Sequence, residues 1–228
     1  MSKDWTKTRA KVKDFIESEI YPKETELAKG TPEAREMLGS LMQLAKDEKI
    51  WALGHPEDIG GGGMPFMEYV YVNEVIGRSS FAMVALGTHS LQDSIMLREF
   101  ASPHWRDQYL EPLVQGEIFP SFGMTEPDVA SSDPTQLQTT AILDNGTWKI
   151  NGTKWFTTGA ARAAYTTVMC RTELDAPSHG AFSMIIVPTD NPGYKIVRET
   201  PVLGINGGHY EVKYDNVEVP EENLLGPR

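Results

Sequence analysis

Two short segments in the second half of the chain combine small, hydroxyl-bearing and aromatic residues in a way that could bind a ligand. The first runs from Phe122 to Asp133. It leaves a predicted strand and enters a loop of small and hydroxyl residues. The backbone N–H groups and hydroxyls of such a loop can cradle an anion such as a pyrophosphate. Composition alone favours a simpler interpretation, an Asp- and Ser-rich turn.

The second segment runs from Asn151 to Gly159 and contains an aromatic pair followed by two threonines. A flat aromatic surface with hydroxyls beside it suits a planar heterocycle that has polar edges. An ordinary strand end can have the same composition, so the residues by themselves leave both interpretations open.

Other chemistry-bearing residues do not form a recognisable site. The run Gly60–Gly63 is not followed by Lys-Ser/Thr and no strong strand precedes it, so we expect a flexible link between helices rather than a phosphate loop. The five histidines include no pair at i, i+4, and with a single cysteine no metal site is expected. Cys170 lies in an apolar strand segment, which favours a packed thiol over a nucleophile. No Gly-x-Ser-x-Gly sequence occurs, so a serine hydrolase is not expected.

Composition limits the class of protein further. The 228 residues carry 21 Lys and Arg against 32 Asp and Glu, a formal net charge of -11, which argues against a general nucleic-acid binder. The hydrophobic fraction of 40% and charged fraction of 23% are those of a globular protein. We find no apolar stretch near the roughly 18 residues that a membrane span needs, and no secretory signal. The single cysteine favours a reducing compartment, so the expected location is the cytoplasm.

The elements that must position the two segments change in kind near Gly116. Before it, apolar residues recur at helical spacing, and helix starts are predicted at Thr31-Pro32, Pro65 and Ser102-Pro103. Gly116 is a plausible helix stop.

After Gly116 short runs of β-branched and aromatic residues alternate with turn clusters. The strands are expected around residues 118–124, 139–143, 148–150, 165–171, 182–187, 194–197 and 211–214. The dipeptides Asn145-Gly146 and Asn151-Gly152, each within a glycosylation sequon, are interpreted as turns. The prediction is an α+β chain with an N-terminal all-α domain at residues 1–116 and a small β-barrel domain at residues 117–228.

Taken together, the motifs resemble the acyl-CoA dehydrogenase family of flavoproteins. Its Thr-Glu-Pro signature is matched at Thr125-Glu126-Pro127, and its Asn-Gly-x-Lys stretch begins at Asn151. Further matches are Pro56 to Gly61, Tyr109 to Glu117, Gly207 to Glu211 and Asp215 to Pro220 followed by Asn223 to Gly226, so the resemblance covers nearly the whole chain. The loop from Asp128 to Asp133 is one residue longer than the usual Gly-Ala-Gly-Ser-Asp. That variant is most similar to family members 10 and 11 and their bacterial relatives, a group that tends towards longer acyl chains.

The resemblance implies a helical domain, a middle β-barrel domain and a C-terminal four-helix bundle, with FAD between the barrel and the bundle. This chain matches the first two and ends before the bundle, so we expect a truncated chain. By position in the family motifs, the residues expected to bind FAD are Phe122, Met124 and Thr125 at the flavin edge, Ala130, Ser131 and Ser132 at the ribityl–pyrophosphate region, Phe156 packed on the isoalloxazine, and Thr157 and Thr158 near its N5. The residues expected to face the pantetheine of acyl-CoA are Ser132, Gly208 and His209.

The implied reaction is α,β-dehydrogenation of an acyl-CoA thioester, as in fatty-acid β-oxidation. A carboxylate removes the α-proton and the β-hydride moves to flavin N5. Since the family's base lies in the bundle, no catalytic residue is expected in this chain, and Glu126 is expected to be structural. Expected partners are acyl-CoA, an electron-transfer flavoprotein and further copies of the chain in the complete enzyme. Alternatives are a separately encoded partner that supplies the bundle, a non-enzymatic scaffold or binding module, and a related flavin oxidase.

Overall fold

The computed structural model describes residues 5–203 and 208–227, which form two compact units. The first unit comprises the described residues up to Ile95 together with Val114–Gly116. The second comprises Met96–Leu113 and the described residues from Glu117 onward. We describe each unit by itself.

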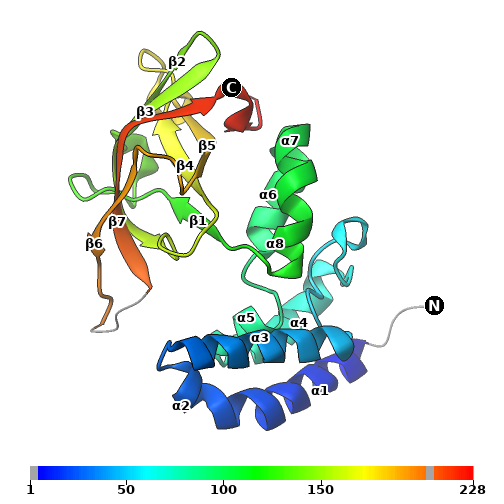
Figure 1. The fold of residues 1–228 in the computed structure, drawn as a ribbon. Coiled ribbons are helices and arrows are strands. Elements are labelled where there is room, and N and C mark those ends of the chain that lie inside the picture. The colour runs from blue at the N-terminus through cyan, green and yellow to red at the C-terminus, as the bar shows by residue number, and fades with distance from the viewer. Residues whose placement is uncertain (1–4, 204–207, 228) are drawn as a thin grey trace. The chain divides into compact units, whose positions relative to one another are not determined.

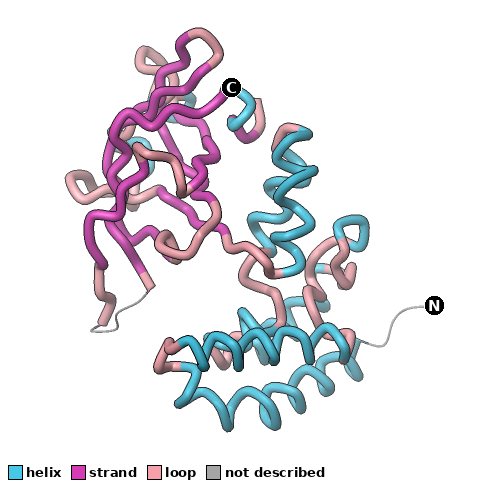
Figure 2. Tube along the Cα trace, viewed as in Figure 1, coloured by secondary structure: helices cyan, strands magenta, loops and turns pink. Residues whose placement is uncertain are grey.

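Helices make up the first unit and connect into the second (Figures 1 and 2). The α-helices of the described residues are α1 (Trp5–Phe15), α2 (Glu24–Leu27), α3 (Pro32–Asp47), α4 (Phe66–Ile76), α5 (Ser80–Ala85), α6 (Leu91–Phe100), α7 (Pro103–Trp105) and α8 (Glu111–Gln115).

The predicted helix starts and the predicted stop are found. The Thr31 hydroxyl accepts a hydrogen bond from the Ala34 N–H and caps α3, α4 begins directly after Pro65, and Pro103 is the first residue of α7. Gly116, with φ +72°, follows the end of α8.

The glycine run Gly60–Gly63 is not the flexible link that its composition suggests. A Cβ built on Gly61 would lie 2.3 Å from the His55 carbonyl oxygen, and one on Gly63 would lie 2.3 Å from Glu57 Cγ. Close backbone packing therefore explains Gly61, and positive φ values of +90° and +60° favour glycine at Gly60 and Gly63.

The second unit is built on an eight-stranded mixed sheet of the described residues (Figure 1). Its strands are β1 (Pro120–Gly123), β2 (Thr140–Asp144), β3 (Thr147–Thr158), β4 (Tyr165–Arg171), β5 (Phe182–Pro188), β6 (Tyr194–Glu199), β7 (His209–Pro220) and β8 (Leu224–Leu225). The pairing order is β6-β7-β3-β2-β4-β5-β8, and β1 pairs in parallel with β4. The predicted order of an all-α region followed by a β domain is confirmed, and the expected small barrel is one mixed sheet.

Both faces of β4 and β5 are covered by apolar side chains. On one face Val168, Cys170, Ile185 and Val187 join a cluster with Trp148 and other residues of β3 and β7. On the opposite face the alternate residues Tyr165 and Ile186 pack with Leu97, Trp105, Leu113 and Leu225. The segment Met96–Leu113 is therefore part of the core of the sheet unit. The predicted domain boundary at 116/117 lies where helices give way to strands along the chain. The packing instead assigns the helical segment Met96–Leu113 to the sheet unit.

Strand β3 is longer than the strand predicted at 148–150, because the turn predicted at Asn151-Gly152 is wrong. Asn145-Gly146 does turn between β2 and β3, with φ +50° and +77°. Asn151-Gly152 instead lies inside β3, where the register against β7 shifts between Ile150 and Gly152. A Cβ on Gly152 would lie 2.3 Å from Thr139 Oγ1, so the glycine allows a close approach at a bulge.

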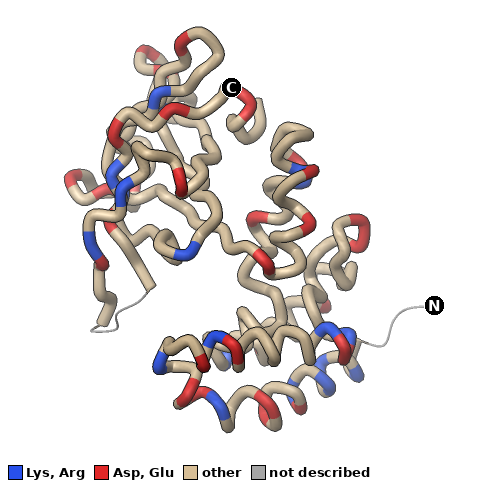
Figure 3. Tube along the Cα trace, viewed as in Figure 1, with Lys and Arg blue, Asp and Glu red and all other residues tan. Residues whose placement is uncertain are grey.

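Charged residues lie along α1, α2 and α3, with both signs mixed on α3, mostly basic residues on α1 and only glutamates on α2 (Figure 3). Of the helices in the described part of the chain, none is both long enough and apolar enough to cross a membrane.

Candidate functional site

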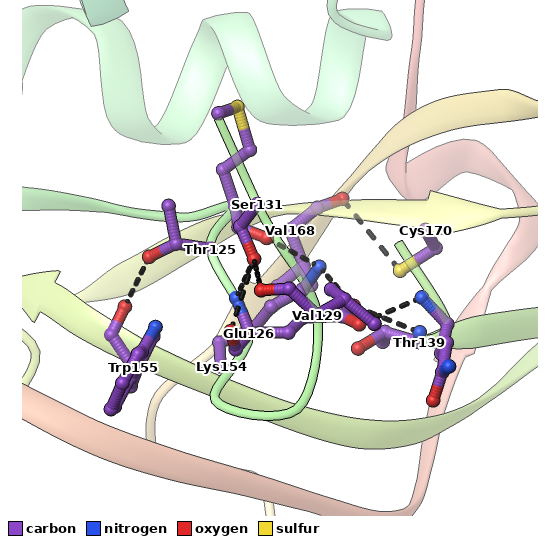
Figure 4. A network of polar contacts seen from close by, with 11 residues as sticks. Thr125, Glu126, Val129, Ser131, Thr139, Lys154, Trp155, Val168 and Cys170 are labelled. Atoms are coloured by element: carbon purple, nitrogen blue, oxygen red, sulfur yellow. Dashed lines mark hydrogen bonds and ion pairs between the residues drawn. The ribbon is translucent and has the colours of Figure 1, made fainter. Parts of the chain in front are cut away.

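The two segments that stand out in the sequence lie side by side in the second unit, because the chain after β1 runs along the end of β3. The Thr125 hydroxyl donates to the Trp155 carbonyl oxygen at 2.7 Å, and the Trp155 N–H donates to the Thr125 carbonyl oxygen at 2.9 Å (Figure 4). Nearer the start of β1, the Ser121 hydroxyl donates to the Thr158 carbonyl oxygen at 2.7 Å. These bonds bring Phe122, Met124 and Thr125 beside the segment that carries Phe156, Thr157 and Thr158.

A second bulge in β3 presents the aromatic pair. The register against β7 shifts between Lys154 and Thr157, so two residues of β3 stand opposite one of β7. Phe156 has φ +50°, a left-handed conformation that costs a non-glycine residue about 1–3 kcal/mol. Its side chain is 42% exposed, and its ring lies 4.7 Å from that of Trp155. The bulge thus turns an apolar ring outward, beyond what packing of the unit requires.

The two threonines after Phe156 have different surroundings. Thr157 is fully buried, and its hydroxyl has no hydrogen-bond partner in the described part of the chain. Thr158 is exposed, and its Oγ1 lies 2.9 Å from His209 Nδ1 on β7. Gly208 lies next to His209, and a Cβ built on it would meet none of the described residues within 4 Å. Gly207 of the same motif lies outside the described residues.

The loop after Glu126 is held by Ser131. The Ser131 hydroxyl accepts from the Glu126 N–H at 2.7 Å and donates to the Glu126 carbonyl oxygen at 3.0 Å (Figure 4). The side chain is buried, whereas Ala130 and Ser132 are exposed. Of the three loop residues expected at a ligand, Ser131 therefore uses its hydroxyl to shape the loop, and its neighbours form the accessible surface.

Beneath this surface lies a buried ion pair that sequence analysis missed. Lys154 Nζ lies 2.8 Å from Glu126 Oε1 and donates to the Met124 carbonyl oxygen at 2.8 Å. The carboxylate also accepts from the N–H groups of Thr139 at 2.9 Å and Gln138 at 2.7 Å (Figure 4). Glu126 is 4% exposed and Lys154 is 0% exposed.

The surroundings of Glu126 keep it ionised. Burial alone would raise the pKa of the carboxyl, but the Lys154 ammonium and the two backbone N–H groups together hold that pKa below its ordinary value of 4.5. Burial lowers the pKa of Lys154, and the carboxylate opposes that change. One sequence signal could have indicated the pair, since a lysine among the core-facing positions of a strand needs a partner.

Cys170 is a packed thiol, as its apolar surroundings predict. It is fully buried, and burial raises its pKa to about 12. Among the described residues no group of His, Cys, Asp or Glu is arranged to hold a metal ion.

The exposed residues of this site form one surface with an aromatic face and hydroxyl groups beside it, which suits contact with a planar ligand that has polar edges. Phe156 gives an outward aromatic face, Thr158 gives a hydroxyl beside it, and the loop with Ala130 and Ser132 continues the surface. An aromatic ring turned to the surface through a strained backbone conformation is typical of a binding site.

Family models match both parts of the chain. The model of the acyl-CoA dehydrogenase N-terminal domain matches residues 2–117, and that of the middle domain matches residues 121–217. The chain belongs to the acyl-CoA dehydrogenase family.

Individual relatives agree with this assignment. The chain is 38% identical to the probable acyl-CoA dehydrogenase FadE2 of Mycobacterium tuberculosis, over 96% of this chain and 56% of that protein. It is 35% identical to mouse acyl-CoA dehydrogenase family member 10, over 93% of this chain and 22% of that protein. The predicted similarity to family members 10 and 11 and to bacterial relatives is thus confirmed.

Solved structures show the same fold. A Mycobacterium abscessus protein assigned as an acyl-CoA dehydrogenase superposes with a TM-score of 0.90 at 32% identity, over 99% of this chain and 61% of that one. The acyl-CoA dehydrogenase of Geobacillus kaustophilus superposes with a TM-score of 0.79 at 25% identity, over 100% of this chain and 59% of that one. The chain therefore spans from about a fifth to three fifths of the length of these relatives.

Proposed function

We propose that this chain forms the cofactor- and substrate-facing wall of an FAD-dependent acyl-CoA dehydrogenase. The observation that carries the proposal is the junction of β1 and β3. There the Thr125–Trp155 hydrogen bonds join the two family motifs into one surface with an outward Phe156 ring. Family membership favours this function by analogy, and the geometry of the site supports it for this chain.

Each expected FAD-binding residue has a place in this proposal. Phe122, Met124 and Thr125 border the flavin edge, Phe156 packs on the isoalloxazine, and Thr158 offers its hydroxyl near N5. Thr157, whose buried hydroxyl has no partner among the described residues, supports the bulge from inside. Ala130 and Ser132 line the ribityl–pyrophosphate path, and Ser131 holds the loop that carries them. Bound FAD would supply a two-electron acceptor for the substrate β-hydride.

The chain's own carboxylate at the site does not act as the base. Glu126 is ionised, its oxygens accept from Lys154, Thr139 and Gln138, and it is only 4% exposed, so a substrate carbon does not reach its carboxylate. We propose that the base comes from the family's C-terminal domain, which lies outside the two matched family models. On this proposal these two domains by themselves are inactive as a dehydrogenase.

The substrate side of the proposal involves Ser132, Gly208 and His209, which would face the pantetheine of acyl-CoA. The proposal extends to a role in fatty-acid β-oxidation in the cytoplasm, with an electron-transfer flavoprotein as acceptor and a homo-oligomeric complete enzyme.

A flavin spectrum tests the proposal. The purified protein is incubated with FAD, freed of unbound cofactor, and examined by visible absorbance before and after anaerobic addition of an acyl-CoA. Flavin bands that persist support the proposed wall, and their failure to bleach supports the assignment of the base to another domain. Bleaching by the 228-residue chain would place a base within it and refute the second part. A colourless protein would refute the first part and favour a scaffold role or a partner-dependent site.

A further inference from the structure

We propose that His209 is a positioning residue for the Thr158 hydroxyl, and that it orients this hydroxyl towards the bound cofactor. The inference rests on the proposed function, because it assigns His209 a task at the flavin edge in addition to its expected contact with substrate. It predicts that the two side chains act as one unit in cofactor binding.

The geometry that supports this is a direct contact across paired strands. Thr158 of β3 and His209 of β7 are register partners, and Thr158 Oγ1 lies 2.9 Å from His209 Nδ1. The His209 ring also meets the Phe156 ring edge-on, at 6.5 Å between centroids. The backbone of His209 is fixed on the other side, because its carbonyl oxygen accepts from the Thr200 N–H at 2.8 Å. A side chain held in these ways is a rigid support for a neighbouring hydroxyl.

The chemistry of the two groups makes this contact directional. A threonine hydroxyl has a single proton to donate and two lone pairs, whereas each nitrogen of a neutral imidazole either donates or accepts. When His209 Nδ1 carries a proton it donates to Thr158, and the hydroxyl proton is free to point at an acceptor on a ligand. When Nδ1 carries no proton it accepts a hydrogen bond from the hydroxyl, and Thr158 can then only accept from a ligand.

This matters at a flavin because the oxidised ring presents an acceptor at N5 and the reduced ring presents a donor there. His209 can satisfy Thr158 in both cases by changing which nitrogen holds its proton. A residue without a second hydrogen-bonding role, such as alanine, would leave the hydroxyl free to rotate. We therefore expect that removing the His209 side chain weakens FAD binding, because the Thr158 hydroxyl is no longer oriented.

The test is a double-mutant cycle on FAD affinity, measured by quenching of flavin fluorescence in the purified protein. We expect His209→Ala to weaken FAD binding about tenfold and Thr158→Val to weaken it by a similar factor. The double variant should be no more than about twofold weaker than Thr158→Val alone, because both changes remove one unit. His209→Asn, whose amide reaches the place of Nδ1, should restore binding to within about threefold. His104→Ala, at an exposed histidine of α7, is the control and should leave FAD affinity unchanged.

Other outcomes overturn the inference in distinguishable ways. If the unaltered protein does not bind FAD, the proposed function fails and the inference fails with it. If it binds FAD and the two single changes are additive, or Asn does not rescue, the proposed function stands and the role of His209 is refuted. In the ligand-free protein, the His209 imidazole ¹⁵N shifts must change in Thr158→Val. Unchanged shifts would refute the contact itself.

Discussion

Replacing Lys154 by methionine should strongly destabilise the sheet unit, in a way that depends on pH. The substitution keeps an unbranched apolar side chain of similar length and removes the ammonium. Glu126, 4% exposed, is then left with the Thr139 and Gln138 N–H groups alone, and the Met124 carbonyl oxygen loses its donor.

The magnitude follows from what the orphaned carboxyl must do. In the variant, burial without the cation raises the folded-state pKa of Glu126 above its ordinary value of 4.5, so the folded chain takes up a proton instead of burying a charge. At pH 7 the cost is at most that of protonating a group of pKa 4.5, which is 1.36 kcal/mol per pH unit over 2.5 units, about 3.4 kcal/mol. Loss of the bond to Met124 adds about 1 kcal/mol. The sum agrees with the roughly 3–5 kcal/mol typical of breaking a buried ion pair from one side.

The sign of the pH dependence distinguishes this reasoning from a simple packing defect. In the native protein the folded-state pKa of Glu126 is lowered, so its contribution to stability is present above pH 4.5 and lost as the pH falls through the folded-state value. In Lys154→Met the folded-state pKa of Glu126 lies above its ordinary value, so the loss of stability relative to the native protein becomes smaller as the pH falls towards 4.5. Between pH 7 and pH 5.5 the difference in free energy of unfolding between variant and native protein should fall, by at most about 2 kcal/mol for one proton.

Urea unfolding followed by near-ultraviolet circular dichroism at pH 7 and pH 5.5 measures both quantities. Lys149→Met is the matched control, because Lys149 lies on the same strand, and its ion pair with Asp144 is exposed and should contribute less than about 1 kcal/mol. A loss below about 1.5 kcal/mol at pH 7, or an equal loss at both pH values, would refute the account of a carboxyl left without its cation.

Three further outcomes are expected. Phe156→Asn should leave the free energy of unfolding within about 1 kcal/mol of the native value, since asparagine tolerates φ +50°. The same change should weaken FAD binding at least tenfold in the fluorescence titration, and an unchanged affinity would contradict the stacking role. Gly152→Ala should lower the free energy of unfolding in urea by about 2 kcal/mol or more, because its Cβ would clash with Thr139. Gly39→Ala, in α3 with open space around it, should raise the free energy of unfolding by about 0.5–1 kcal/mol, and similar effects at both glycines would argue against the close approach. Cys170, with its pKa raised to about 12, should resist a thiol reagent at pH 8 until the chain is unfolded in urea, and rapid labelling of the folded protein would contradict its burial.

The sequence predicts where the elements lie better than where they end. Two Asn-Gly dipeptides, at Asn145 and Asn151, carry the same local turn signal. The first makes a hairpin turn, because the residues after it pair back with β2. The second makes a bulge within β3, because the residues after it continue to pair with β7. That pairing is a long-range property, so no short window contains it.

The candidate site shows a similar division. Phe156, Thr157 and Thr158 stand out by composition, and the structure places them in the last residues of β3, beyond the strand predicted at 148–150. Their different surroundings are set by a bulge, which moves the ring outward and buries the next hydroxyl. The pair of Glu126 and Lys154 joins residues 28 positions apart, and only the approach of the chain after β1 to β3 brings them together.

The reciprocal bonds of Thr125 and Trp155 have a consequence for how this surface fluctuates. Two motifs that are 30 residues apart along the chain share their hydrogen bonds, so neither can detach from the sheet without breaking the bonds of the other. Opening of the surface is therefore one cooperative event rather than two independent ones. A ligand that contacts either segment slows the local unfolding of both. Because the two segments are ordered together, the conformational entropy of the second segment is already lost before the ligand contacts it.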